Sequence, residues 1–295
     1  ITEDGHWLKV DSLAQIKDDT WREAKAGAVL SPDAKEKCLI VTENGKFEKV
    51  PVDVVFPVLH GLYGEDGTVQ GILELAKIPY VGCGVAASAN TMDKSLTKKV
   101  VEGTGVRQAR YYLALACDFA CNPEGVVRTA AEQLGSFPVF VKPCSQGSSV
   151  GVAKANNMLE LAEGLTEAFK MDSKVLVEEF IDGHEVECAV LGNEHPQTST
   201  VGEIAPTQEF YTFDAKYKDE SSRLYIPAHI TGEQLETVRQ DALRVYTALG
   251  CRGLSRVDFF VTHDGGEVVF NELNAIPGFT SISMYPVSYT HLRAH

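Results

Sequence analysis

The chain has 295 residues, of which 44% are hydrophobic and 23% are charged, a composition typical of globular proteins large enough for two or three domains. Its formal net charge of −14 argues against a nucleic-acid partner, because phosphate backbones attract basic surfaces. We expect neither a membrane span nor a signal peptide, since no apolar run is long enough. The seven cysteines are scattered, and Cys117 and Cys121 have neither zinc-ligand spacing nor nearby histidines, which favours reduced thiols in a cytoplasmic protein.

The first half of the chain alternates strand and helix patterns. Residues 52–82 contain an apolar run, a glycine-rich loop, a helical pattern and a short apolar run, which predicts a buried strand in a parallel α/β layer. Residues 91–106 predict a helix that Thr91 caps and Gly103 ends. A second helix is expected at about 123–134, followed by a strand within 137–143.

The second half continues the same mixed pattern. Strands are expected at 174–181 and 184–192, and the second alternates apolar and polar residues like a half-buried strand. Residues 231–250 predict an amphipathic helix with a Thr-x-x-Gln capping pattern and Gly250 at its end. The chain therefore reads as α/β throughout, without an internal repeat.

The segment "VKPCSQGSSVGV" (141–152) joins two apolar stretches through small polar residues. One lysine beside many free backbone N–H groups suits a phosphate chain, although Lys142 precedes the glycines and the segment is not a Walker A loop. Small polar residues are also what an ordinary hairpin connection requires. The segment alone leaves both interpretations open.

Residues 255–274 predict a hairpin, because Asp-Gly-Gly at 264–266 separates two apolar runs. Centring the turn on Gly265 places three pairs on one face: Arg256 with Asn274, Asp258 with Glu272, and Phe260 with Phe270. The other face, which is mostly core, holds Val257, Phe259, Val261, Val269, Asn271 and Leu273.

Two carboxylates and a carboxamide on the first face form an oxygen-ligand set of the kind that Mg²⁺ prefers: Asp258, Glu272 and Asn274. Arg256 beside them suits charge on a transferring phosphoryl group. The alternative is an ordinary surface salt bridge between Arg256 and a facing carboxylate.

Seven segments occur in an order that resembles the D-alanine–D-alanine ligase family of the ATP-grasp superfamily. They are "HGLYGEDG" (60–67), "MDK" (92–94), "VKPCSQGSSVGV" (141–152), "EVECAVLG" (185–192), "FDAKY" (213–217), "SRVDF" (255–259) and "NELNAIPGFTSISMYP" (271–286). The resemblance runs from near residue 1 to about residue 286 and implies a homodimer that uses D-alanine and ATP.

The resemblance implies an ATP-grasp α/β fold in which two subdomains sandwich the nucleotide. A Rossmann-like, substrate-binding N-terminal domain would occupy 1–92, the central subdomain 93–180 and the catalytic C-terminal subdomain 181–286. The family's first strand, glycine-rich loop and helix precede the segment that Ile1 resembles, so we expect this domain to be incomplete and to lack the loop's glutamate. Residues 287–295 do not resemble the family's C-terminal helix and are interpreted as a non-native tail.

The resemblance also implies roles for single residues. The ATP site would comprise Lys94, Lys142, Ser149, Glu178, Glu179, Ile181, Glu185 and Lys216. Within it, Lys94 and Lys142 would contact the phosphates under the 145–151 loop, which would lie between two antiparallel strands. The adenine would lie against 178–181, and the ribose against Glu185. Two Mg²⁺ or Mn²⁺ ions would bind the three hairpin ligands named above.

The implied reaction has two steps, an acyl phosphate formed from one D-alanine and ATP, and its attack by the amine of a second D-alanine. Arg256 and the N–H of Gly278 would stabilise the tetrahedral oxyanion, and residues 209–227 would form a lid that excludes water. The remaining implied contacts to the substrates are His60, Glu65, Ser283 and Met284, and the lid would be held by a bond between Tyr217 and Ser148.

Three alternatives stay open at this stage. By resemblance to the family, the presence of Tyr217 implies an amine rather than a hydroxyl nucleophile, and D-serine stays open as another second substrate. A different carboxylate–amine ligase of the superfamily is the second alternative. The third is a protein that binds the nucleotide without turnover. Loss of the expected missing segments would affect the activity of the chain but would not change the family that it resembles.

Overall fold

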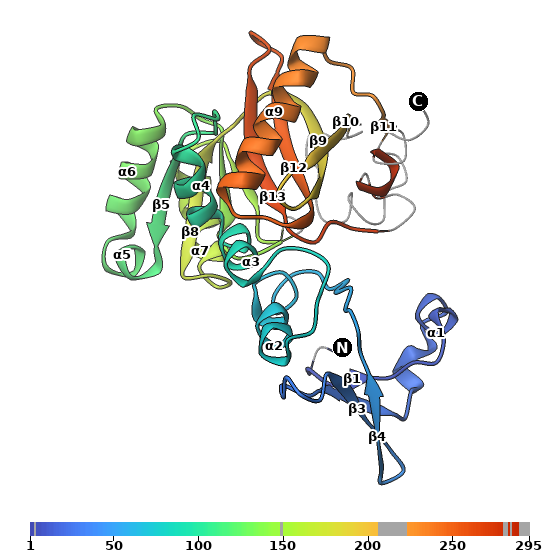
Figure 1. Ribbon diagram of the computed structural model, residues 1–295. Coiled ribbons are helices and arrows are strands. Elements are labelled where there is room, and N and C mark those ends of the chain that lie inside the picture. Colours follow the sequence, from blue (N-terminus) through green and yellow to red (C-terminus); the bar gives the residue numbers. More distant parts are fainter. Residues whose placement is uncertain (3, 148–149, 206–222, 280–282, 284, 289–295) are drawn as a thin grey trace. The chain divides into compact units, whose positions relative to one another are not determined.

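A computed structural model describes residues 1–295 except 3, 148–149, 206–222, 280–282, 284 and 289–295 (Figure 1). The chain divides into two compact units. The small unit comprises Ile1–Pro57 and Thr68–Val81, and the large unit comprises Val58–Gly67 and Gly82–His295. Within the described residues, none of the helices combines the length and the apolar character that crossing a membrane requires.

The small unit is built on a four-stranded antiparallel sheet whose strands follow chain order. Its strands are β1 (Trp7–Leu8), β2 (Gly27–Leu30), β3 (Cys38–Glu43) and β4 (Lys46–Pro51), and its helices are α1 (Leu13–Lys17), a 3₁₀ turn (Thr20–Glu23) and α2 (Thr68–Ala76). The β3–β4 turn is formed by Asn44 and Gly45, both with positive φ, as a two-residue hairpin requires. Leu30, Leu73 and Ile78 are the centre of a small core.

The predicted parallel layer at 52–82 is present only in part. Helix α2 forms as expected, but the parallel pairing is a single bridge between Val55 and Tyr80. The expectation of a buried strand was wrong, since Val54 is 58% and Phe56 47% exposed. Val52 and Val55 pack against the small core, whereas Val54 and Phe56 between and beside them stay exposed, so the segment is covered only at single positions.

The first sheet of the large unit is antiparallel, in the order β5-β8-β6-β7. The strands are β5 (Tyr111–Leu115), β6 (Val139–Pro143), β7 (Ala153–Ala155) and β8 (Lys174–Glu179), with α5 (Ala116–Cys121), α6 (Pro123–Leu134) and α7 (Met158–Ala168) beside them. Helices α6 and α7 contact each other and the sheet, and they enclose a core that includes Leu134, Leu161 and Leu165. The prediction of a helix at 123–134 is confirmed.

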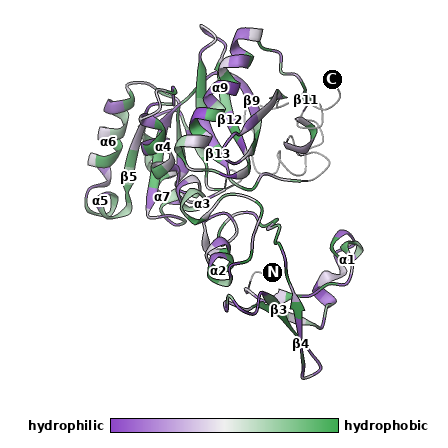
Figure 2. Ribbon diagram, viewed as in Figure 1, coloured by the Kyte–Doolittle hydropathy of each residue, from purple (hydrophilic) through white to green (hydrophobic). Residues whose placement is uncertain are grey.

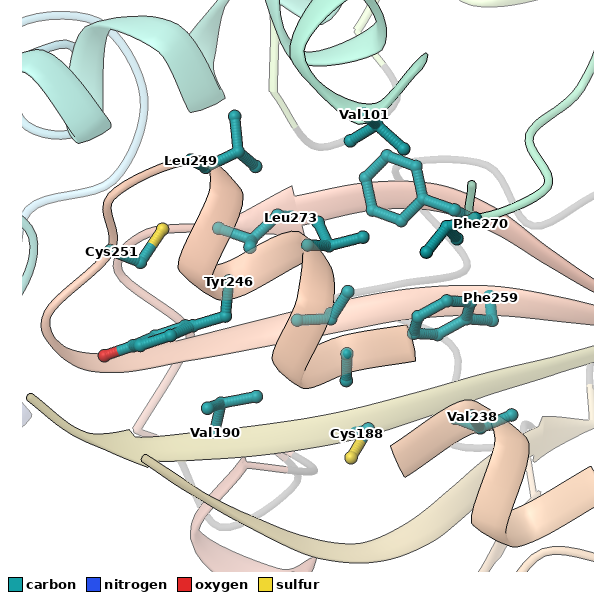
Figure 3. Packing of buried hydrophobic residues seen from close by; sticks show 14 of the residues in the cluster. Val101, Cys188, Val190, Val238, Tyr246, Leu249, Cys251, Phe259, Phe270 and Leu273 are labelled. Carbon is teal, nitrogen blue, oxygen red and sulfur yellow. The ribbon is translucent and has the colours of Figure 1, made fainter. Parts of the chain in front are cut away.

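The second sheet has the order β11-β10-β9-β12-β13. Its strands are β9 (Gly183–Gly192), β10 (Gln197–Ala205), β11 (Arg223–Tyr225), β12 (Gly253–Thr262) and β13 (Val268–Asn274), and its neighbours are α3 (Val85–Met92), α4 (Lys94–Glu102) and α9 (Gly232–Ala248). Strands β12 and β13 carry both hydrophobic and hydrophilic residues (Figure 2). Figure 3 shows the core between this sheet and its helices, in which Tyr246 of α9 lies on the side of Cys251 and Leu249, while Phe259 and Phe270 lie near each other at the opposite side.

The caps and ends of the helices α4 and α9 agree with the sequence-based predictions, with one exception. Thr231 and Gln234 form the predicted capping box of α9. Helix α4 ends before Gly103 as predicted, but its cap is Asp93, whose side chain accepts from two backbone N–H groups. The expectation that Thr91 is the cap was wrong because Thr91 belongs to the last turn of α3, where its hydroxyl donates to a backbone carbonyl.

Strand β9 is more buried than its alternating pattern indicated. All five residues from 186 to 190 are buried, so the expectation of a half-buried strand was wrong. The strand lies between β10 and β12 in the sheet, and α9 packs against it. A charged residue in this stretch, Glu187, is therefore buried as well.

Candidate functional site

A cavity of about 390 Å³ lies between the two sheets of the large unit. Its apolar lining comes from both sheets and includes Phe140, Val152, Phe180, Ile181, Ile204, Phe260 and Phe270. Its charged lining includes Lys94, Lys142, Glu178, Glu185, Glu203 and Glu272. A cavity lined by both apolar side chains and lysines can hold a planar ring and an attached anion.

The loop after β6 reaches this cavity. Strands β6 and β7 pair antiparallel, as expected for the strands on either side of the loop. Lys142, near the end of β6, lines the cavity together with Gln146 of the loop. The ammonium group of Lys94 donates to the backbone carbonyl of Gln146 at 2.7 Å, so the two predicted lysines lie at the same end of the cavity.

Glu178 connects Lys142 to a third lysine, Lys98, which the sequence analysis missed. Its carboxylate oxygens are 2.5 Å from the Nζ of Lys142 and 2.7 Å from the Nζ of Lys98. Burial alone would raise the pKa of Glu178, but the charges of Lys142 and Lys98 outweigh it and lower the pKa to about 2. The available signal for Lys98 was its position one helical turn after Lys94, which places both on one helix face.

The lowered pKa of Glu178 predicts a pH-dependent contribution to stability. A drop from 4.5 to about 2 corresponds to about 3 kcal/mol, which is present above pH 4.5 and is lost as the pH falls towards 2. Glu178→Gln is expected to lower the free energy of unfolding by about this amount at pH 7, with a smaller difference below pH 4.5. Urea unfolding at several pH values measures it, with exposed Glu163→Gln as the control. A difference independent of pH would contradict the prediction.

The other predicted contacts to the nucleotide base and ribose lie at the same cavity. Glu179, Ile181 and Glu185 all line it. The carboxylate of Glu179, however, is held by Arg110, whose Nε and backbone N–H donate to it at 2.7 and 2.9 Å. Glu179 therefore does not offer a free carboxylate to a ligand, whereas Ile181 contributes apolar lining.

Glu203 is a further lining residue that the sequence analysis missed. It is buried, and its carboxylate contacts His184 Nδ1 at 2.7 Å and accepts from the backbone N–H of His229 at 2.8 Å. Burial would raise the pKa of Glu203, but the His229 N–H and His184 outweigh it and lower the pKa. No motif marked Glu203, because the contact joins β9, β10 and the segment after β11.

The β12–β13 hairpin has the predicted register at its open end only. Asp258 pairs with Glu272 and Arg256 with Asn274, as expected. The expected pairing of Phe260 with Phe270 was wrong, because a bulge after Asp258 places Phe259 opposite Phe270. Both of those rings are fully buried and meet edge to face, so core packing sets the register beyond the bulge.

The bulge also moves Asn271 out of the core face where the sequence analysis placed it. Asn271 lines the cavity next to Glu272, and its Oδ1 accepts from Lys142 Nζ at 3.3 Å. An extra residue on one strand re-aims the side chains around it, which is a common use of bulges beside functional sites. Consecutive residues of β13 therefore both face the cavity.

Arg256 lies in a buried network at the open end of this hairpin. Its guanidinium donates to both oxygens of Asp258 at 2.8 and 2.7 Å, and its Nε is 3.1 Å from Glu187. Asn274 donates its amide N–H to Asp258 at 3.0 Å. Burial disfavours the charged guanidinium, but the charges of Asp258 and Glu187 outweigh it and raise the pKa of Arg256. The alternative of a surface salt bridge was wrong, because both Asp258 and Glu187 are buried.

The remaining predicted substrate residues lie in two segments, residues 60–65 before α2 and the segment that follows β13. Glu65 accepts from the backbone N–H of Gly61 at 2.6 Å and from that of Ile276. Burial raises the pKa of Glu65 despite these bonds. A Cβ atom on Gly278 would be 2.7 Å from the hydroxyl of Ser283, so these two residues pack together. His60 is exposed.

Several predicted residues lie outside the described part of the chain. They are Ser148, Ser149, Lys216, Tyr217 and Met284, together with most of the expected lid at 209–227 and all but two residues of the expected tail at 287–295. The division of the chain into domains that end at residues 92, 180 and 286 stays a prediction.

Comparisons with known proteins identify the class of protein. Residues 1–83 match the family described as D-ala D-ala ligase N-terminus, and residues 100–292 match D-ala D-ala ligase C-terminus. The chain is 46% identical to a D-alanine–D-alanine ligase of Caldicellulosiruptor bescii and 51% identical to one of Chlorobium phaeovibrioides. Each alignment covers 97% of this chain, and 78% and 80% of the relative.

Solved structures agree with the sequence relatives. The VanG D-Ala:D-Ser ligase of Enterococcus faecalis has a TM-score of 0.87 at 39% identity, over 99% of this chain and 83% of that one. The D-alanine-D-alanine ligase of Coxiella burnetii has a TM-score of 0.81 at 33% identity, over 98% of this chain and 77% of that one. The fold is thus that of the ATP-grasp ligases. The chain belongs to the D-alanine–D-alanine ligase family.

Proposed function

We propose that this protein joins two D-alanine molecules into D-alanyl-D-alanine with conversion of ATP to ADP and phosphate. Its product would serve cell-wall peptidoglycan synthesis in the cytoplasm, and the family suggests a homodimer. The observation that supports this most is the position of the β12–β13 hairpin, whose Glu272 and Asn271 line a cavity that also contains Lys94 and Lys142. The identity of the substrates is inferred from membership of the ligase family.

In this proposal each side chain has a task that its position suits. Lys94 and Lys142 would bind the ATP phosphates at the charged end of the cavity, and the apolar end would receive the base. The carboxylate of the first D-alanine attacks the γ-phosphate, which gives an acyl phosphate and ADP. The amine of the second D-alanine then attacks the acyl carbon, loses a proton and displaces phosphate.

Arg256 and the N–H of Gly278 would stabilise the negative charge that develops on the acyl oxygen. The two carboxylates that hold Arg256 fix the direction of its guanidinium before substrate binds. Glu65 would help in the same way, because it holds the backbone at Ile276, two residues before Gly278. Ser283 beside Gly278 would contact the second D-alanine.

The hairpin would hold divalent metal ions in this proposal. Asp258 and Glu272 face each other across the strands, and Asn274 donates its amide nitrogen to Asp258, which leaves its oxygen directed elsewhere. Among the described residues, no group of three histidine, cysteine or acidic side chains could hold a metal ion; the proposed set is instead two carboxylates and one amide. Mg²⁺ or Mn²⁺ held there would neutralise phosphate charge.

Phosphate release from ATP tests the proposal, measured with Mg²⁺ and each candidate acceptor. Release with D-alanine alone, but not with L-alanine, is the expected result. If phosphate release requires D-lactate or D-serine together with D-alanine, that compound, and not a second D-alanine, is the second substrate. D-serine is included because of the likeness to the D-Ala:D-Ser ligase. No release with any of these acceptors would overturn the proposal.

A further inference from the structure

Lys98 is buried in a place where a lysine is normally unfavourable. It is 3% exposed, on the same helix as Lys94, and does not belong to the lining of the 390 Å³ cavity. Its ammonium group contacts Glu178 at 2.7 Å and donates to the carbonyl of Ala109 at 3.4 Å. Burying an ammonium group is expensive unless it is paired, so its partner Glu178 accounts for its position.

Glu178 divides its two oxygens between two lysines that differ in access to the cavity. Oε2 contacts Lys142, which lines the cavity, and Oε1 contacts Lys98, which does not. Without Lys98, the carboxylate could turn both oxygens towards Lys142 and neutralise it. Lys98 prevents this, because each oxygen then has its own cation and Lys142 keeps donor capacity for a ligand.

We propose that Lys98 is a positioning residue for nucleotide binding, which acts by holding one oxygen of Glu178 so that Lys142 remains available to the phosphates. This inference rests on the proposed function, because it assumes that the ligand at Lys142 is a nucleotide. Lys98 itself does not touch the ligand. Its effect therefore depends on the presence of Glu178, and this dependence separates positioning from a direct attraction between Lys98 and phosphate.

Calorimetric binding of ADP with Mg²⁺ tests the inference without requiring turnover. Lys98→Met is expected to weaken ADP binding by about tenfold, within the range measured for coupled neighbours. Lys98→Arg, which keeps a cation beside Glu178, is expected to recover most of that loss. The matched control is Lys99→Met on the next residue of the helix, since Lys99 is 64% exposed and contacts Glu102 and the ring of Tyr111 rather than Glu178. We expect no change greater than twofold there.

A double-mutant cycle supplies the decisive comparison. In the Glu178→Gln background, Lys98→Met is expected to change ADP binding by less than about twofold, because no carboxylate remains to be held. Removing both buried partners also avoids an unpaired buried charge, so this variant keeps the test valid if Lys98→Met alone does not fold. An equal loss in both backgrounds, or an undiminished affinity of Lys98→Met, would overturn the inference. Failure of the unaltered protein to bind ADP would instead overturn the proposed function.

Discussion

Replacing Arg256 by lysine is expected to lower kcat by about 10²–10³-fold, the usual effect of losing one donor to a developing oxyanion. The guanidinium spans both oxygens of Asp258 and also contacts Glu187, a geometry that a single ammonium group cannot reproduce. Lysine is chosen because it keeps a positive charge between the two buried carboxylates. An apolar replacement would leave them unpaired, at about 3–5 kcal/mol in stability.

The control for this substitution is Arg252→Lys, at an arginine just before β12 that is 65% exposed and only loosely paired with Glu194. Its kcat is expected to match that of the unaltered protein. Thermal melts of both variants show whether the large unit remains folded. Full activity of folded Arg256→Lys would exclude the assigned role of the guanidinium.

Replacing Glu272 by glutamine is expected to raise the Mg²⁺ concentration needed for half-maximal phosphate release and to lower kcat by about 10²-fold. The carboxylate lines the cavity and lies opposite Asp258, so its removal takes away one of two acidic ligands of the proposed metal site. Stability is expected to change little, because the side chain is 29% exposed and its contact with Lys94 is 3.7 Å long.

Titration of phosphate release with Mg²⁺ measures this effect directly. Glu267→Gln is the matched control, because Glu267 lies just before β13 on the same hairpin, is 57% exposed and pairs with Arg107 away from the cavity. Its Mg²⁺ dependence should remain that of the unaltered protein. An unchanged Mg²⁺ requirement in Glu272→Gln would remove Glu272 from the proposed ligand set.

Most of the large unit could be predicted from local sequence. The caps and turns are short-range signals, and the capping box at Thr231 and the end of α4 at Gly103 were predicted correctly. The hairpin register at Asp258 and Glu272 followed from the turn and the alternation of side chains. The resemblance of several motifs to one family led to the fold.

The features that were missed depend on contacts between distant segments. The bulge at Asn271 follows from packing of Phe259 against Phe270, which no turn signal records. Lys98 and Glu187 look like ordinary surface charges in the sequence, because their burial depends on partners far along the chain. Buried ion pairs are a property of the assembled sheets and helices, so composition and periodicity cannot reveal them.

Helix α4 carries Lys94 and Lys98, and its start is anchored at three points. Asp93 caps it and pairs with Lys174 of β8, and the backbone N–H of Lys94 donates to the carbonyl of Cys144 at 3.0 Å. Lys94 and Lys98 therefore lie on the same anchored helix, and a movement of that helix displaces both side chains. A small tilt of α4 would shift Lys94 relative to the loop after β6 and, at the same time, Lys98 relative to Glu178. The positions of the loop and of Glu178 at this end of the cavity are therefore mechanically coupled through α4.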